Sequence, residues 1–318
     1  MKLLITGIHG FVGSNLVAYL AQENEIYGLD IIAPEKEGVV KTFSWEDLDA
    51  GRIPEVDGII HLAGKAHDTK NQADAKVYFK VNRDLTIKMF DYFCAHPSIK
   101  KFIFFSTAKA AADKVKGILT EDVIPAPVGP YGESKIAAEN YILSCMNNRP
   151  YQFEGREVYI FRPCMIHGPG NKGNLNLLYN VVRKGIPWPL GAFDNRRTFT
   201  SVENICFAVN GVLTKDVPSG IYNMGDDEAL STNELIEEIC KSLGKKAHIW
   251  KLPKGLMNGI AKVGGWLHLP LNPERLRKLT ESYVSSNAKI KNALGIEKMP
   301  VDTIDGLKVT LDSFNKLK

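Results

Sequence analysis

A glycine-rich turn near the start of the chain limits what this sequence can fold into. The turn is Gly7-Ile8-His9-Gly10-Phe11-Val12-Gly13, and it follows the apolar run Lys2 to Thr6. Apolar spacing typical of a helix continues to Gln22, so we expect a strand, a tight turn and a helix. Glycines at this spacing let the backbone approach a pyrophosphate, which the helix N-terminus stabilises. The sequence therefore predicts a dinucleotide site with contacts from Gly7, Gly10, Phe11, Val12 and Gly13.

Asp30 adds to this site from the end of the second expected strand, Glu25 to Leu29, twenty residues after Gly10. A carboxylate there accepts hydrogen bonds from the adenosine ribose hydroxyls and selects NAD over NADP. The next residues, Ile31 and Ile32, offer no arginine for a 2′-phosphate. The alternative reading is that Asp30 is only a turn residue. We expect NAD as the cofactor.

Strands and helices alternate through the first half of the chain, which indicates an α/β fold with a Rossmann-like, doubly wound parallel sheet. The alternation fades after about Pro163, where proline and glycine become frequent. We expect an NAD-binding domain over residues 1–163, with contributions from about 195–225. A smaller, interleaved α/β substrate-binding region should occupy residues 164–318. The expected strands are Lys2 to Thr6, Glu25 to Leu29, Gly58 to Leu62, Lys101 to Ser106 and Glu157 to Arg162. The expected helices are Phe11 to Gln22, Ala73 to Ala95, Tyr131 to Asn147, Asn174 to Lys184, Thr232 to Leu243 and Thr303 to Asn315.

The composition argues against several classes of protein. The net charge of +4 and the absence of a long Lys/Arg run argue against a nucleic-acid partner. The chain begins directly with the first strand, without a signal-peptide core, and no apolar run reaches membrane-spanning length. Its five cysteines stand singly, which argues against a disulfide framework and a zinc site. We expect a cytoplasmic protein with no metal and no membrane partner.

One segment leaves a question about membranes. Lys254 to Leu267 is amphipathic and carries Trp266. Such a segment can lie on a membrane surface, but we expect it to pack against the protein or a second subunit.

Tyr131 and Lys135 suggest the chemistry. Four residues apart, they share one face of a helix. A free phenol has a pKa of about 10, and a neighbouring ammonium favours the phenolate and lowers that pKa. Tyr131 then becomes a general acid and base, although the pair alone is weak evidence.

The segment His61-Leu62-Ala63-Gly64 ends another expected strand with small residues that let a cofactor lie close. Leu62, Ala63 and Gly64 are therefore predicted cofactor contacts, whereas His61 is expected to be a packed or hydrogen-bonded residue. Asn82 is expected to bond backbone groups from within a helix and to help place Lys135.

Together these residues resemble the extended short-chain dehydrogenase/reductase superfamily, which contains NAD-dependent nucleotide-sugar epimerases, dehydratases and reductases. Phe104-Phe105-Ser106-Thr107 is similar to the Ser/Thr cluster that ends a strand in that family. The resemblance implies that Thr107 bonds the reacting sugar oxygen, that Tyr131 exchanges its proton, and that Lys135 holds the nicotinamide ribose. It also implies that Ser106 contacts the cofactor.

The residues after Thr107 limit which reactions of this family the chain is expected to catalyse. Dehydratases of this family carry Asp-Glu there, but this chain has Ala108 and Lys109. Dehydration is therefore disfavoured. The chain most resembles UDP-4-keto-N-acetyl-hexosamine reductases and UDP-hexose 4-epimerases, and both readings stay open. A non-catalytic NAD sensor is a weaker alternative, since such relatives usually lose the tyrosine or the lysine.

The substrate side is less defined. Asn174, at the start of an expected helix, is a candidate phosphate contact through the helix N-terminus. The resemblance implies that Arg197 binds the diphosphate of a UDP-sugar, for which a guanidinium fork is well suited. Arg277 is a weaker candidate whose alternative is a solvated surface charge. The resemblance also implies a homodimer formed by the helices Ala73 to Ala95 and Tyr131 to Asn147.

Overall fold

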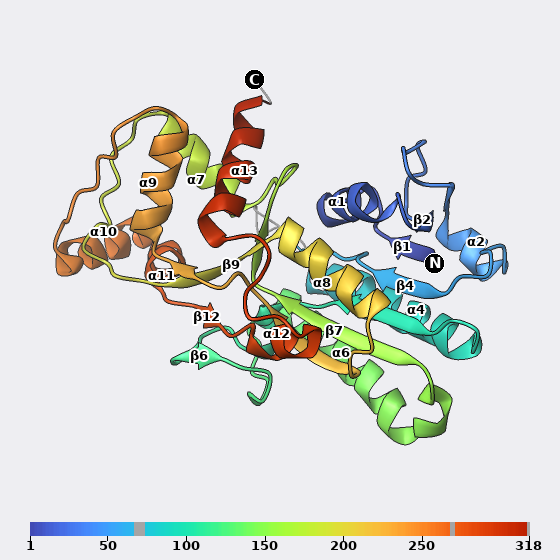
Figure 1. The fold of residues 1–318 in the computed structure, drawn as a ribbon. Coiled ribbons are helices and arrows are strands. Elements are labelled where there is room, and N and C mark those ends of the chain that lie inside the picture. The colour runs from blue at the N-terminus through green and yellow to red at the C-terminus, as the bar shows by residue number, and fades with distance from the viewer. Residues whose placement is uncertain (67–73, 268–270, 317–318) are drawn as a thin grey trace.

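A computed structural model describes residues 1–66, 74–267 and 271–316 of the chain. Within these residues, seven strands form one parallel sheet in the order β10-β7-β5-β4-β1-β2-β3 (Figure 1). The strand order reverses between β1 and β4, and doubly wound sheets bind ligands at the carboxyl ends of the strands at such a point. The bounds are Lys2–Thr6 (β1), Glu25–Leu29 (β2), Lys41–Phe43 (β3), Gly58–His61 (β4), Lys101–Phe105 (β5), Glu157–Pro163 (β7) and Gly220–Met224 (β10).

Helices cover both faces of this sheet, which confirms the expected fold class. Side chains alternate along β1, so Leu3 and Ile5 belong to one apolar core and Leu4 belongs to the other. The first core includes residues of α1 (Phe11–Leu20), α8 (Val202–Thr214) and α12 (Ala288–Leu294). The second includes residues of α2 (Trp45–Asp49), α4 (Leu85–Ala95) and α6 (Pro130–Asn148).

The helix expected over Ala73 to Ala95 contains an irregularity. Ala73 lies outside the described residues, and the helix is seen from α3 (Ala75–Tyr78) onward. A π-helical segment, Phe79–Asp84, separates α3 from α4. Single π turns inside longer helices occur frequently at functional sites. Here the π turn contains Asn82.

The remaining boundaries agree with expectation to within two residues at each end. The helix expected over Phe11 to Gln22 ends at Leu20, and the one expected from Tyr131 begins at Pro130. Gly129, just before it, has φ +87°, a conformation that favours glycine, and proline suits the first helical position. The short β3 and the distant β10 were not among the expected strands.

The second half of the chain builds a smaller region around its own apolar core, which includes Tyr179, Trp188, Leu235 and Leu311. Its three-stranded sheet has the order β11-β9-β8. Its strands are β8 (Met165–His167), β9 (Arg197–Ser201) and β11 (Ala229–Leu230), and its helices are α7 (Asn174–Arg183), α9 (Thr232–Ser242), α10 (Lys254–Trp266), α11 (Pro273–Thr280) and α13 (Thr303–Lys316). Short elements complete the chain: α5 (Ala108–Ala111), β6 (Ile118–Leu119), a 3₁₀ turn (Pro150–Phe153) and β12 (Val284–Ser285).

The two halves are interleaved, because α8 and β10 return to the large sheet after β9 (Figure 1). The domain division at residue 163 stays a prediction. No helix in the described parts of the chain is both long and apolar enough to cross a membrane.

Candidate active site

The glycine turn lies at the carboxyl end of β1, where its backbone folds tightly. The Gly7 N–H donates to Leu29 O at 2.9 Å, and the Gly10 N–H donates to Gly7 O at 3.0 Å. A Cβ on Gly13 would lie 2.6 Å from Gly7 O, so only glycine fits there. Gly7 has φ +66°, and a Cβ on it would meet Ala63 N at 3.0 Å. This close packing places the start of α1 directly after β1, the arrangement in which a helix N-terminus binds the pyrophosphate of a dinucleotide.

Asp30 lies beside this turn, at the end of β2. Its carboxylate accepts hydrogen bonds from the His9 N–H at 3.0 Å and from the Ile31 N–H at 2.7 Å. The bond to His9 ties the carboxylate to the glycine turn itself. Each oxygen keeps a lone pair for a ribose hydroxyl.

His61 is a hydrogen-bonded core residue, as expected. Thr6 Oγ1 accepts the N–H groups of Leu62 at 3.1 Å and Ala63 at 2.9 Å, so its own proton goes to His61 Nδ1 at 2.7 Å. His61 Nε2 then donates to Thr86 Oγ1 at 3.1 Å. Burial lowers the pKa of His61 to about 3, with a smaller contribution from Lys135, so the ring is neutral. This chain of bonds fixes the predicted contacts Leu62 and Ala63 against β1.

Tyr131 and Lys135 lie in the first turns of α6, and Thr107 lies at the start of α5. Thr107 hydrogen-bonds the Tyr131 hydroxyl, which lowers the pKa of Tyr131, but burial raises it more, and the net shift is upward. The expectation that Lys135 would lower this pKa is wrong for this arrangement. Lys135 Nζ instead donates to Phe105 O at 2.7 Å and stands 4.8 Å from the centre of the Phe104 ring. Burial lowers the pKa of Lys135 to about 8.

Asn82 connects the small-residue segment after β4 to α6. Its amide oxygen accepts the Lys65 N–H at 2.7 Å, and its amide nitrogen donates to Lys65 O at 3.1 Å and to Ser134 Oγ at 3.0 Å. A Cβ on Gly64 would lie 3.1 Å from both Asn82 Oδ1 and Lys135 Nζ. Asn82, Gly64 and Lys135 therefore lie close together, and Asn82 also hydrogen-bonds Ser134, the residue before Lys135.

Ser106, a predicted cofactor contact, hydrogen-bonds a buried carboxylate in the structure. Its hydroxyl donates to Glu139, which is buried on α6 one turn beyond Lys135. Arg162, on β7, donates to the same carboxylate, with Nη2 2.5 Å from Oε2. The sequence reasoning missed Glu139. Its signal was a carboxylate four residues after Lys135, on the same helix face.

The predicted substrate contacts lie in two places. Asn174 is the exposed first residue of α7, where the helix N-terminus is available to an anion. Arg197 and Arg277 meet at the C-terminal end of α11. Arg197 donates from Nε to Glu281 O at 3.1 Å and from Nη2 to Lys278 O, so two of its nitrogens are engaged by backbone. Arg277 Nη1 pairs with Asp113 at 3.1 Å and with Glu281 at 3.2 Å.

Two residues that the sequence reasoning did not single out shape the loops around the site. The Asn15 side chain donates to Pro169 O at 3.0 Å, which ties the His167-Gly168-Pro169-Gly170 segment to α1. The Tyr283 hydroxyl donates to Ala108 O at 2.8 Å and lies 2.9 Å from Ala112 O, which holds the turn after Thr107. Neither carries a sequence signal, because both bonds join positions more than 150 residues apart.

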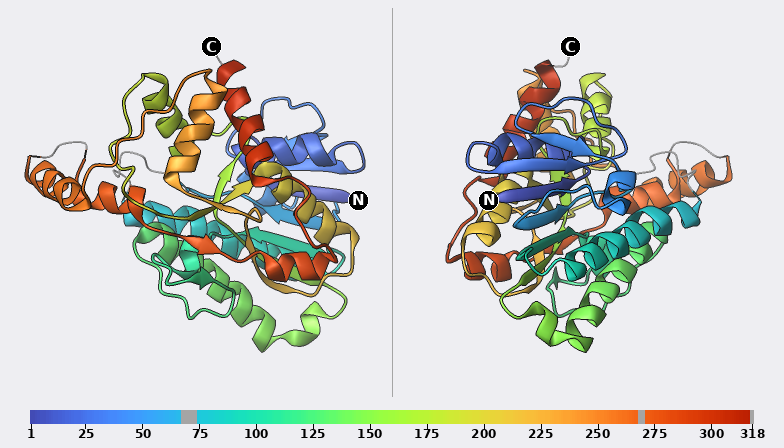
Figure 2. Two further views of the ribbon diagram at one scale, coloured as in Figure 1. Left: turned by 60° about the vertical axis from the view of Figure 1, so that its left-hand side comes forward. Right: turned by 90° about the vertical axis from the view of Figure 1, so that its right-hand side faces the viewer.

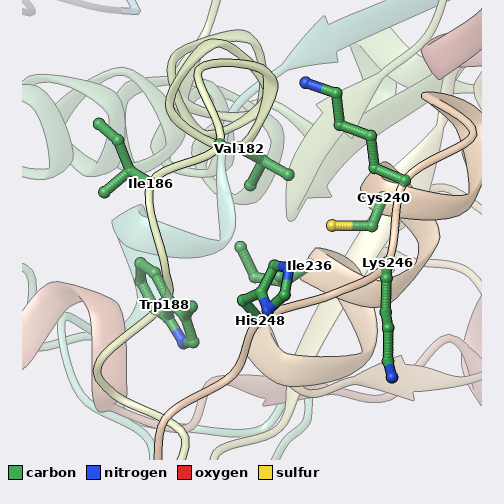
Figure 3. Close-up of a pocket in the computed structure, with 9 residues that line it drawn as sticks. Val182, Ile186, Trp188, Ile236, Cys240, Lys246 and His248 are labelled. Carbon is green, nitrogen blue, oxygen red and sulfur yellow. The ribbon is translucent and has the colours of Figure 1, made fainter.

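A separate cavity of about 300 Å³ lies between α7 and α9. Figure 3 shows Val182, Trp188, Ile236 and His248 around it. None of the predicted site residues lines it. It is therefore distinct from the candidate active site.

Comparisons with known proteins agree with this geometry. The NAD dependent epimerase/dehydratase family matches residues 3–225. A UDP-glucose 4-epimerase of Vibrio cholerae is 29% identical over 272 residues, which are 79% of this chain and 78% of the relative. A GDP-6-deoxy-D-mannose reductase of Pseudomonas aeruginosa is 26% identical over 92% of this chain and 91% of the relative.

A solved structure shows the same fold over the whole chain. The UDP-glucuronic acid 4-epimerase of Bacillus cereus, crystallised with NAD, has a TM-score of 0.76 at 21% identity and covers 100% of this chain and 99% of its own. The close packing at the glycine turn and the position of the Asp30 carboxylate fit the close backbone approach and the ribose acceptor that NAD needs. The chain therefore belongs to the NAD dependent epimerase/dehydratase family, and its cofactor is NAD.

Proposed function

We propose that this protein is a 4-epimerase of UDP-hexoses, of the UDP-glucose or UDP-N-acetylglucosamine type. The observation that carries the proposal is the hydrogen bond between Thr107 and Tyr131, one helical turn from the buried Lys135. The three side chains lie at the carboxyl end of the sheet, close to the glycine turn. A sugar hydroxyl placed between Thr107 and Tyr131 would meet both a hydrogen-bond partner and a proton acceptor.

In this proposal, NAD held at the glycine turn would supply a hydride acceptor and donor for sugar C4. Tyr131 acts in its phenolate form, which Thr107 favours and burial opposes, so that it takes the proton of the C4 hydroxyl and gives it back when C4 is reduced from the opposite face. Thr107 bonds the C4 oxygen and favours the ionised form of Tyr131. Lys135, held by Phe105 O next to Gly64, binds the nicotinamide ribose hydroxyls. Gly7, Gly10, Phe11, Val12 and Gly13 would surround the pyrophosphate, and Asp30 the adenosine ribose.

The diphosphate of the substrate would be bound from two sides. The N-terminus of α7, with Asn174, supplies backbone donors. Arg197 and Arg277 supply positive charge from the end of α11. Because carbonyls and carboxylates already engage both arginines, substrate binding would have to exchange some of these bonds.

Reduction of a UDP-4-keto-N-acetyl-hexosamine is the second candidate. Here Tyr131 donates its proton to the C4 oxygen once, and the reaction stops. The similarity to a GDP-6-deoxy-D-mannose reductase over 92% of the chain supports it. Dehydration is less well supported, because Ala108 and Lys109 stand where dehydratases carry Asp-Glu.

Product analysis without added cofactor separates the two candidates. The purified protein is incubated with UDP-glucose and with UDP-N-acetylglucosamine, and its absorbance is used to detect co-purified nicotinamide. Conversion to the galacto sugar supports the epimerase. No conversion, followed by turnover of a 4-keto sugar with NADH, supports the reductase.

Tyr131→Phe provides the matched test of mechanism. We expect it to lose most turnover and to keep NAD binding, while Tyr151→Phe, at an exposed position, keeps both. Full activity of Tyr131→Phe would contradict the proposal.

The homodimer and the cytoplasmic location stay predictions, which light scattering and cell fractionation would test.

A further inference from the structure

Helix α10 exposes a stripe of large apolar side chains. Figure 2 shows α10 projecting from the rest of the chain in both views. The exposed stripe, here called the α10 surface, repeats at helical spacing and runs along its full length. Its members and exposed fractions are Leu256 (52%), Ile260 (45%), Val263 (54%), Trp266 (81%) and Leu267 (52%).

The same helix buries a second, neighbouring stripe. Met257, Ala261 and Gly264 are buried, and Met257 and Ala261 belong to the core that includes Leu276 of α11. The expectation that this segment packs against the protein is thus correct for one stripe of the helix. The α10 surface lies on the adjacent arc and is left without cover in the described parts of the chain.

The sequence around α10 is uniformly basic. Residues 239–273 contain six lysines and no aspartate or glutamate. All six lysines are exposed, and Lys254 and Lys262 lie on α10 itself. Trp250, just before the helix, is also 53% exposed. Exposed apolar and aromatic side chains flanked by lysines match the interfacial zone of a membrane with anionic lipids.

We propose that the α10 surface docks onto an anionic lipid bilayer, with α10 lying in the plane of the interface. The charge favours this occupant over a second copy of the chain, because self-association through α10 would bring Lys254 and Lys262 of two chains together with no acidic side chain on either helix. The proposal departs from our expectation of no membrane partner. It goes beyond the proposed function and does not depend on which sugar is the substrate.

Docking would also orient the candidate site. α10 packs on α11, and Arg277 of α11 pairs with Asp113 at 3.1 Å. Lys109 bonds the same Asp113 at 3.2 Å, and the Lys109 N–H donates to Thr107 Oγ1 at 3.3 Å. Helix α10 is thus linked to the substrate side of the site through its packing on α11 and through three polar contacts.

Vesicle flotation tests the proposal with the full chain. We expect the protein to float with vesicles of equal parts phosphatidylcholine and phosphatidylglycerol, and not with phosphatidylcholine alone. Raising the salt concentration should weaken the binding, because it screens the lysines. Val263→Asp should weaken it by at least about tenfold, since a charge replaces a buried apolar contact at the interface.

Matched variants keep the test specific. Val309→Asp places the same change on α13, at a valine that is 44% exposed, and should leave binding unchanged. Lys262→Glu should reduce binding by at least about fivefold, because it removes the attraction of one lysine for the anionic surface and adds a repelling charge. Lys298→Glu, at an exposed lysine of a distant turn, should not.

Tryptophan emission gives a second readout. Binding should shift the emission to shorter wavelength, and Trp266→Phe should remove most of this shift while the protein still floats. Equal loss of binding by Val309→Asp and Val263→Asp would overturn the proposal. So would failure of the wild-type protein to bind anionic vesicles, or a Val263→Asp protein that changes only its oligomeric state.

Discussion

Glu139 and Arg162 form an ion pair that solvent does not reach, one helical turn beyond Lys135. Arg162 Nε lies 3.1 Å from both carboxylate oxygens, and Nη2 lies 2.5 Å from Oε2. Within the described residues, Nη1 of Arg162 has no hydrogen-bond partner. The positive charge of Arg162 is therefore balanced by Glu139. Glu139 also raises the pKa of Lys135 and thereby offsets part of the effect of burial. The pair connects the stability of the sheet to the charge of a predicted catalytic residue.

Glu139→Gln should therefore destabilise the protein by about 3–5 kcal/mol, because it leaves the Arg162 charge buried and unpaired. The double variant Glu139→Gln/Arg162→Met should recover much of this loss, since no unpaired charge remains. Chemical denaturation measures both. A single variant as stable as the wild type would show that Arg162 finds another partner.

Lys135 should make stability depend on pH between about 8 and 10.5. Its pKa is about 8 in the folded protein and 10.5 in a free lysine, so in this window the unfolded chain binds more protons. Stability should rise with pH across the window, by on the order of 3 kcal/mol from this group. The cost of the buried charge is fully present below pH 8.

Comparison with Lys135→Met isolates this contribution, because every other titrating group is shared. Denaturation of the nucleotide-free proteins should give a difference between wild type and variant that changes through the window and is constant below it. Glu139→Gln should move the start of the change to lower pH, since Glu139 raises the pKa of Lys135. A pH-independent difference would contradict the depressed pKa.

Thr107→Val should reduce activity near neutral pH and move the pH profile. The hydrogen bond from Thr107 lowers the pKa of Tyr131, and burial raises it. Without the Thr107 hydroxyl, the pKa of Tyr131 should therefore rise further. Hydrogen bonds to charged groups contribute about 1.5–3 kcal/mol, so kcat/KM at pH 7 should fall by tenfold or more. The rising limb of the profile should move to higher pH, and NAD affinity should not change. A profile that keeps its position would place the titrating group elsewhere.

The sequence was most informative where local pattern decides structure. The strands β1, β2, β4, β5 and β7 were predicted to within one residue, because each is a short apolar run buried on both faces. The positions of the glycine turn, Asp30 and α6 relative to the sheet follow from those strands. The three-stranded sheet and the π turn at Asn82 depend on contacts between distant segments, which periodicity does not reveal. Lys135 shows the same limit: whether its amine faces Tyr131 or Phe105 O is a matter of tertiary packing.

Gly13→Ala should disable the nucleotide turn. A Cβ there would lie 2.6 Å from Gly7 O and 2.8 Å from Ile8 Cα, and both are backbone atoms that move only with the turn itself. Overpacking of this kind costs about 1–3 kcal/mol, and the displaced turn should weaken NAD binding by at least about tenfold.

Gly259→Ala is the matched control, because Gly259 also lies within a helix but has open space around it. That variant should keep NAD affinity and gain about 0.5–1 kcal/mol of stability, since alanine favours helix over glycine. Isothermal titration with NAD and thermal unfolding measure the two effects. Equal NAD affinity in the two variants would mean that α1 does not need its close approach to Gly7 to bind the dinucleotide.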